Sequence, residues 1–217
     1  MHDLLPISVE IPEPEEPGAD LLSEAIRSTM FDSQLYLFET VGILTSVISR
    51  DPERQGTILL SLVKPLMQEL SENLQLFRAG NADLVPVVKV HHLIMALGNI
   101  SKGFPDYPQN APEDYMVPAV KVFSEVAQAI LVCLEAMNIL KPIRDAVSAR
   151  SVGGSTSERT TLLQTRFAFA RILATAGPSV TKFIPVLMNN LLAHFEPSEL
   201  VDFMNFIGLL IHKLQVR

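Results

Sequence analysis

The residues with the clearest chemical potential form a basic segment inside an acidic chain. From Lys141 to Arg171 the net charge is +4, whereas the whole chain of 217 residues carries −7. Lysine and arginine spaced along a helix and a loop can follow a phosphate backbone, since phosphate contacts depend more on charge than on fixed geometry. Solvated arginines on an outer helix face are the alternative, and the residues alone favour that alternative by about two to one.

Residues suited to catalysis or metal binding are few. His91 and His92 are adjacent, so a helix would direct them to different sides, and zinc would require more donors at wider spacing. We therefore expect one histidine to be packed and the other solvated. Cys133 falls on an apolar stripe and is expected in the core. GxSxG, phosphate-binding and dinucleotide motifs are absent from the sequence, which predicts no enzyme, no cofactor and no metal.

Composition restricts the class of protein. With 48% hydrophobic residues, the chain can bury a sizeable core. One cysteine excludes an internal disulfide framework and fits a reducing compartment. The first residues do not resemble a secretory signal, and no uncharged apolar run reaches the roughly 18 to 20 residues of a membrane helix. A soluble intracellular protein without membrane insertion is expected.

The elements that must position the basic segment begin with a helical hairpin over Phe31 to Leu70. A stripe at helical spacing predicts the buried face of its first helix: Leu37, Val41, Leu44 and Ile48. Asp51 and Pro52 are a capping residue and a first-turn proline, so they predict the start of the second helix. Its stripe is Leu59, Leu62, Leu66 and Leu70. The short link between the helices predicts that they run antiparallel and bury their stripes against each other.

Similar hairpins follow along the chain. Helices are expected from Pro86 to about Lys102, from Tyr115 to Asn138, from Leu162 to Ala176 and from Ser179 to His194, with a last helix from Pro197. The domain prediction is a helical array over 31–217, with hairpins at about 32–78, 85–139 and 141–195 and a final helix at 197–215. The predicted fold class is all-α: an open HEAT-repeat solenoid of about three and a half repeats.

Two segments are expected to lie outside the helical array. Residues 1–30 form an acidic, proline-rich arm or loop, with room for a short helix over Leu21–Thr29. A solvated loop is favoured there, by about four to one, over an acidic segment that attracts a basic partner. The Ser-, Thr- and Gly-rich stretch at about 147–161 is expected to be a mobile insertion.

Several strings in the chain carry a family resemblance. FDSQLYLFETVGIL, DPERQ and LVKPLMQEL, followed later by RFAFARI, FIPVLMNNLL and FEPSELVDFMNFIGLLIHKL, resemble a middle-to-C-terminal part of fungal-type exportin-T, the tRNA exportin of the karyopherin-β (importin-β) superfamily. The similarity covers Phe31 to Leu214. The combination of FDSQLYLFE, DPERQ and FEPSELVDF is far more specific than any apolar helical pattern.

The resemblance implies a function and partners. It implies a receptor that shuttles between nucleus and cytoplasm, exports tRNA together with Ran-GTP, and binds tRNA through its shape and backbone. Most of the Ran contact is expected in N-terminal repeats outside this chain. The resemblance is also compatible with contacts to nuclear pore proteins. Open solenoid ends favour self-association.

The resemblance also implies which basic residues would contact RNA. Lys141 and Arg144 lie in the matching string KPIRDA, and Arg166 and Arg171 lie in RFAFARI. Arg150 and Arg159 fall in the insertion and cannot be carried over. The alternative function is a HEAT-repeat scaffold for protein interactions without RNA binding. Salt-sensitive tRNA binding would distinguish the two functions.

Overall fold

A computed structural model describes residues 7–9, 11, 29–79, 84–112, 114–138, 168–192 and 200–214. Every regular element in these ranges is a helix, which confirms the all-α prediction. The elements are α2 (Thr29–Ser46), α3 (Pro52–Arg78), α4 (Leu84–Lys102), α5 (Pro118–Asn138), a helical segment at 168–176, the 3-10 helix η1 (Gly177–Phe183), α8 (Ile184–Leu192) and α9 (Leu200–Leu214).

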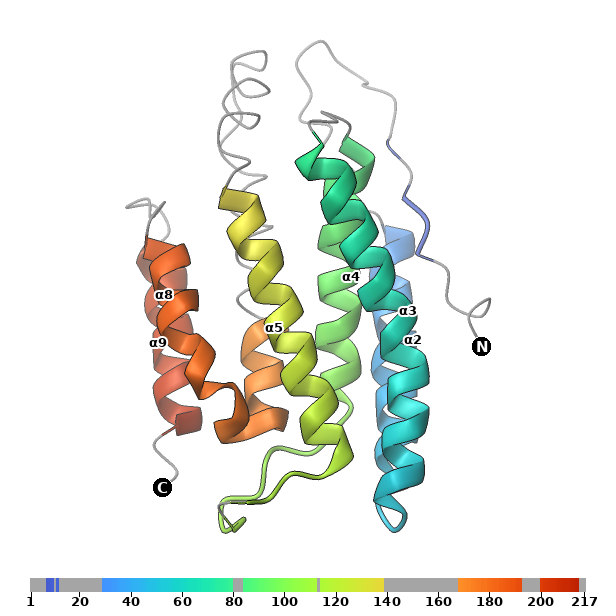
Figure 1. The fold of residues 1–217 in the computed structure, drawn as a ribbon, viewed down its shortest axis with the longest axis vertical. Helices are drawn as coiled ribbons and strands as arrows, with labels where there is room; N and C mark the ends of the chain where they lie inside the picture. Colours follow the sequence, from blue (N-terminus) through green and yellow to red (C-terminus); the bar gives the residue numbers. More distant parts are fainter. Residues whose placement is uncertain are drawn as a thin grey trace.

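The helices form two stacked layers. Successive helices alternate in direction, and α3, α5 and α8 lie nearer the viewer than α2, α4 and α9 in Figure 1. Helix α2 packs on α4 within one layer and α3 packs on α5 within the other, while α3 also packs on α4 across the layers. Neighbouring helices of one layer therefore pack on each other in these pairs, as in the predicted HEAT-type stack.

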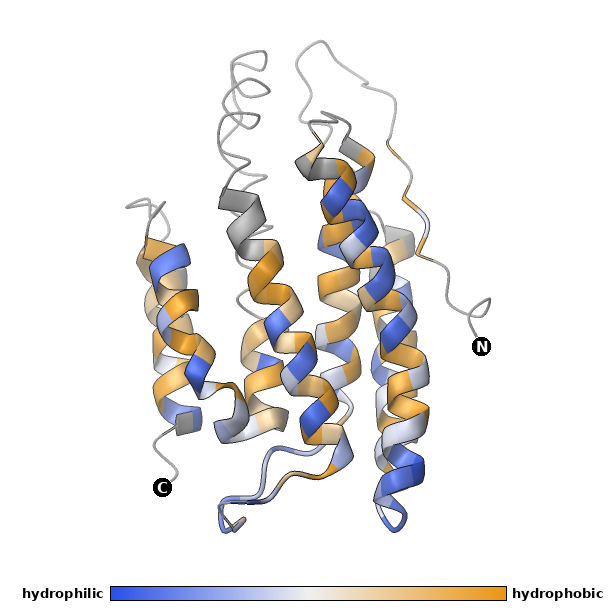
Figure 2. Ribbon diagram, viewed as in Figure 1, coloured by the Kyte–Doolittle hydropathy of each residue, from blue (hydrophilic) through white to orange (hydrophobic). Residues whose placement is uncertain are grey.

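The predicted stripe of α3 is mostly buried. Leu59, Leu66 and Leu70 lie in the core together with Val63, whereas Leu62 is half-buried. Apolar stripes at helical spacing are buried in the next two helices as well: Val90, Ile94, Leu97 and Ser101 in α4, and Val122, Val126, Ile130 and Cys133 in α5. Figure 2 shows hydrophilic residues spaced along the visible face of α3 and mostly hydrophobic ones along α4. The α3 cap is also confirmed, since the Arg54 amide donates to the Asp51 carboxylate at 3.0 Å.

The predicted stripe of α2 is wrong. Leu37 and Leu44 are exposed, and the side of α2 that faces α4 carries Phe31, Phe38 and Gly42 instead. A Cβ at Gly42 would lie 2.3 Å from the carbonyl oxygen of Ile100, so only glycine permits this approach of α2 to α4. Helix α2 is apolar on several sides, and spacing alone therefore did not indicate which side would be buried.

The expectation for the histidine pair is also wrong, because both rings are buried. His92 stacks on Phe31 with 3.6 Å between ring centroids, and the two Nδ1 atoms of His91 and His92 lie 3.0 Å apart. Helix α4 is enclosed on most of its circumference, so residues on two of its sides are shielded from water. Neither histidine takes the solvated position that a half-exposed helix would offer.

One part of the N-terminal arm packs on the helices. Ile7 is buried in the core, and the Lys89 ammonium donates to its carbonyl oxygen. The same ammonium pairs with the Glu69 carboxylate at 2.7 Å. Residues 7–9 and 11 carry no helix, and the expected helix over Leu21–Thr29 lies almost entirely outside the described residues.

Candidate nucleic-acid interface

Arg171 is the one predicted RNA-contact residue that the structure describes, and it projects from a nearly buried helix. Within 168–176 every other residue is buried, whereas Arg171 is only half-buried. This segment approaches α4 closely, since a Cβ at Gly98 would lie 2.8 Å from the Ala168 Cβ. Small residues on both helices allow this contact, and it leaves the Arg171 backbone little freedom to move.

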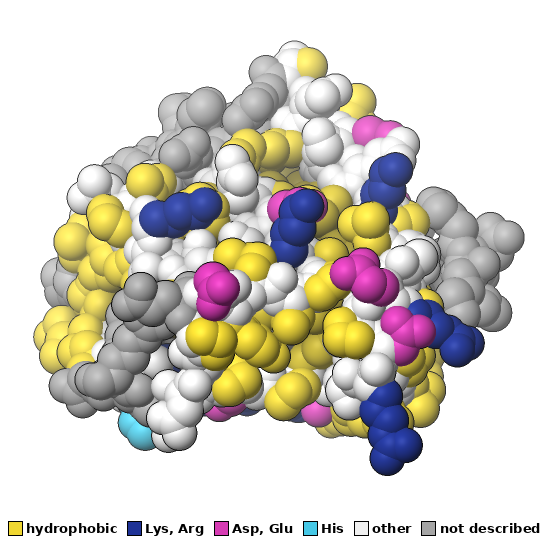
Figure 3. Space-filling model, turned by 60° about the horizontal axis from the view of Figure 1, so that its bottom comes forward, with side chains coloured by type: hydrophobic (Ala, Val, Ile, Leu, Met, Phe, Trp, Pro, Cys, Tyr) yellow, Lys and Arg dark blue, Asp and Glu magenta, His cyan; other side chains and the backbone are white. Residues whose placement is uncertain are grey.

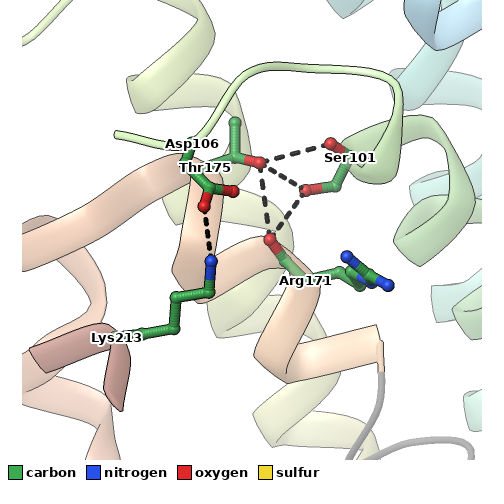
Figure 4. Close-up of polar contacts among 5 residues, drawn as sticks. All are labelled: Ser101, Asp106, Arg171, Thr175 and Lys213. Carbon is green, nitrogen blue, oxygen red and sulfur yellow. Dashed lines mark hydrogen bonds and ion pairs between the residues drawn. The ribbon is translucent and has the colours of Figure 1, made fainter. Parts of the chain in front are cut away.

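Buried hydroxyl groups hold the same backbone. Figure 4 shows Ser101 of α4 and Thr175 beside the carbonyl oxygen of Arg171. The hydroxyl groups of Ser101 and Thr175 donate to this oxygen at 3.2 and 3.4 Å, respectively. The two hydroxyls lie 3.1 Å apart, and that of Thr175 is also 3.2 Å from the Ser101 carbonyl oxygen. The Arg171 guanidinium points away from the Asp106–Lys213 ion pair in this view. The network therefore fixes the backbone from which the charged side chain extends.

The other predicted contacts lie outside the described residues. This holds for Lys141, Arg144 and Arg166, for the insertion at about 147–161, and for Arg150 and Arg159 within it. The structure therefore places one member of the basic segment and does not test whether the four residues come together.

Basic side chains elsewhere in the described ranges are dispersed. Lys102 pairs with Glu39 at 2.6 Å, and Lys213 pairs with Asp106. On the face drawn in Figure 3, lysine and arginine side chains are separated by acidic and hydrophobic ones. This face does not present a continuous basic patch of the kind that usually marks a nucleic-acid surface.

Sequence reasoning did not single out several exposed basic residues, among them Arg54, Lys64, Lys121 and Lys182. They lie on α3, α5 and η1, and α5 packs on both α3 and η1. Exposed carboxylates share these surfaces, among them Glu53 and Glu125. These four bases are far apart along the chain, so no single stretch of sequence around them has a marked positive charge. A count of charges along the chain therefore overlooks them.

The buried histidines are unsuited to acid–base catalysis near neutral pH. Burial, together with the neighbouring His92, lowers the pKa of His91 to about 3, and burial with the nearby Lys89 charge lowers the pKa of His92 to about 4. Both rings are therefore neutral at pH 7.

Within the described ranges, no cluster of three or more histidine, cysteine or acidic residues could hold a metal ion. None of the described helices is long and apolar enough to cross a membrane.

Comparison with known proteins places these observations in a family. A family model described as Exportin-T matches residues 1–217. The Exportin-T of Coprinopsis cinerea is 68% identical over 216 residues, and that of Laccaria bicolor is 64% identical over 215. The Exportin-T of Mycosarcoma maydis is 35% identical over 215 residues. These alignments cover 98–99% of this chain but only 18–19% of each relative.

Proposed function

The chain belongs to the exportin-T family, and on that basis we propose that it forms part of a receptor that carries tRNA out of the nucleus together with Ran-GTP. The support is the family match over residues 1–217 combined with the stack of helical pairs. The chain spans about a fifth of the length of the relatives that it matches. The proposed transport therefore belongs to a longer receptor, which would shuttle between nucleus and cytoplasm.

We propose that Lys141, Arg144, Arg166 and Arg171 contact tRNA phosphates. The observation that carries this proposal is the half-buried Arg171 within 168–176, where every other residue is buried. A rigid helix presents a charge at a defined place, which suits recognition of a folded RNA by its shape and backbone. The net charge of +4 from Lys141 to Arg171 supplies the attraction within an acidic chain.

A binding titration against tRNA tests this function. The 217-residue chain, and a receptor of the relatives' length, would be titrated with and without Ran-GTP between 50 and 200 mM salt. Reversing the four charges to Glu should weaken binding and flatten its salt dependence, because each phosphate contact releases about one condensed counterion. The loss should be similar for different tRNA species, since backbone contacts carry no base information.

A matched control separates the site from the total charge. Reversing Arg54, Lys64, Lys121 and Lys182 to Glu changes the net charge by the same amount on α3, α5 and η1. If the proposal holds, this control retains more affinity and a steeper salt slope than the first variant. An equal loss of tRNA affinity in the two variants would show that binding depends only on the overall electrostatic field of the chain. Unchanged affinity after the first reversal would leave its four residues as ordinary solvated side chains.

A protein-interaction scaffold is the second candidate function. The observation in its favour is exposed apolar surface on both α2 and α9, including Tyr36, Leu37 and Leu44 on the first and Val201 and Met204 on the second. Such surface is typical of protein contacts, which include neighbouring repeats, nuclear pore proteins and a second copy of this chain. A scaffold of this kind would show no salt-sensitive tRNA binding, so the same titration separates the two functions.

A further inference from the structure

The connector between α4 and α5 reaches helices that come much later in the chain. The Tyr107 amide donates to the carbonyl oxygen of Ala174 at 2.7 Å, near the end of the helix at 168–176. The preceding residue, Asp106, forms an ion pair with Lys213 in the last turn of α9 (Figure 4). Two consecutive connector residues therefore hold the ends of two different helices.

The chain turns sharply at the point that Tyr107 contacts. Gly177 has a φ of +58°, a conformation that other residues rarely adopt. A Cβ at Gly177 would lie 2.3 Å from Cγ of Tyr107, so the aromatic ring occupies the space where a side chain would stand. The 3-10 helix η1 follows directly, before α8 begins. Because 3-10 geometry makes poorer hydrogen bonds than an α-helix, this junction is suited to act as a hinge.

Empty space lies beside this turn. A cavity of about 390 Å³ is bounded by the connector, the junction and the end of α9, with Gln109, Leu173, Pro178, Thr181 and His212 in its lining. The cavity is partly open to solvent, so the end of α9 has free space on the side that faces the connector.

One side of α9 packs against the core and the other side is exposed. Phe206 and Leu210 are buried, whereas Leu200, Val201 and Met204 are exposed. Among the labelled elements, α9 makes its main backbone approach to η1, which is itself part of the junction. A rotation at the junction would therefore carry α8 and α9 along.

We propose that Gly177 is a hinge within the stack and that the Asp106–Lys213 ion pair is its latch. With the latch closed, the connector holds α9 at the angle seen in the structure. With the latch open, α8 and α9 turn about Gly177 so that the end of α9 moves in the space of the cavity beside the connector. Both partners are partly exposed, and such ion pairs are weak and screened by salt. The angle between successive helical pairs would therefore respond to ionic conditions.

Pulsed electron paramagnetic resonance on the 217-residue chain tests the proposal. Spin labels would be attached at Gln128→Cys of α5 and Asn205→Cys of α9, both exposed positions, in a Cys133→Ala background. The labelled chain would be diluted with unlabelled chain so that only distances within one molecule are recorded. We expect one narrow distance distribution at low salt, and a broader or bimodal one at 1 M salt.

Variants identify the latch. Asp106→Asn should give the broad distribution at low salt already and should remove most of the effect of added salt. Glu39→Gln is the matched control, because it breaks the Lys102 ion pair between α2 and α4 and should leave the distribution unchanged. Helix content measured by circular dichroism should be equal in all variants. A narrow distribution that neither 1 M salt nor Asp106→Asn alters would overturn the proposal, as would loss of helix content accompanying the broadening.

Discussion

The ring of His92 lies flat against the ring of Phe31, with 3.6 Å between their centroids and 7° between their planes. This stack joins the first turns of α2 to the middle of α4, and it requires an imidazole without charge in a buried place. The adjacent His91 ring lies edge-on to His92 at 5.2 Å. The contact between α2 and α4 therefore depends on two histidines that must remain neutral.

Acid should destabilise this contact. The pKa values of His91 and His92 are about 3 and 4 in the folded chain and 6.5 in the unfolded chain, so the unfolded chain takes up protons first as the pH falls. The stabilisation is present above pH 6.5 and is lost as the pH falls through 6.5 toward the folded values. From pH 7 to 5.5, each histidine should cost about 1.2 kcal/mol of unfolding free energy. Urea unfolding at the two pH values measures the loss.

His92→Phe provides the control for acid sensitivity, because it retains a stacked ring and removes one titrating group. Its unfolding free energy should fall by about 1.2 kcal/mol less than that of the unmodified chain over the same pH interval. Carboxylates contribute equally to both chains, so the difference isolates the histidine. An identical pH dependence in the two chains would contradict the buried, neutral state of His92.

Leu66→Ala should destabilise the chain by about 2 to 5 kcal/mol. Leu66 is 7% exposed on the core-facing stripe of α3, and its truncation would leave a cavity. Leu60→Ala on the same helix is the matched control, since Leu60 is 43% exposed and should cost well under 1 kcal/mol. Chemical denaturation of both variants measures the difference. Similar losses at the two positions would contradict the assignment of the buried face.

Gly42→Ala should cost about 1 to 3 kcal/mol, because the new methyl group would collide with the Ile100 carbonyl and force α2 away from α4. Gly208→Ala in α9 is the opposite case, with no heavy atom within 4 Å of the new Cβ. There the gain in helix propensity should stabilise the chain by about 0.5 to 1 kcal/mol. Thermal unfolding should therefore shift in opposite directions for the two variants, and a stabilised Gly42→Ala chain would exclude the close approach of α2 to α4.

The 217-residue chain should self-associate at high concentration through the exposed face of α2. Tyr36 is 73% exposed and Leu44 is 64% exposed, and covering apolar surface contributes ~25 cal/mol per Å² removed from water. Replacing Leu37 and Leu44 of α2, and Val47 directly after its end, by Gln should shift sedimentation velocity profiles toward the monomer. The same replacements at the exposed polar positions Thr57, Ser61 and Ser71 of α3 should have no effect. A clean monomer of the unmodified chain at high concentration would rule out this interface.

The sequence by itself determined that the chain is helical, where α3, α4 and α5 lie, and to which family it belongs. Helical spacing of large apolar residues selects one face only when the other face is polar, and that condition holds for α3 with Lys64 and Gln68 on its outer side. Specific strings such as FDSQLYLFE and FEPSELVDF carried the family assignment, since they are far rarer than an apolar period.

Only the tertiary structure decided which side of α2 is buried, where the histidines lie and how the connector is fastened. Helix α2 has apolar residues around most of its circumference, so the choice depended on the fit of Gly42 against Ile100. His91 and His92 are both buried because neighbouring helices enclose α4. Asp106 and Lys213 are 107 residues apart and meet only when the stack forms. Steric fit and contacts between distant segments depend on three-dimensional proximity, which local sequence patterns do not contain.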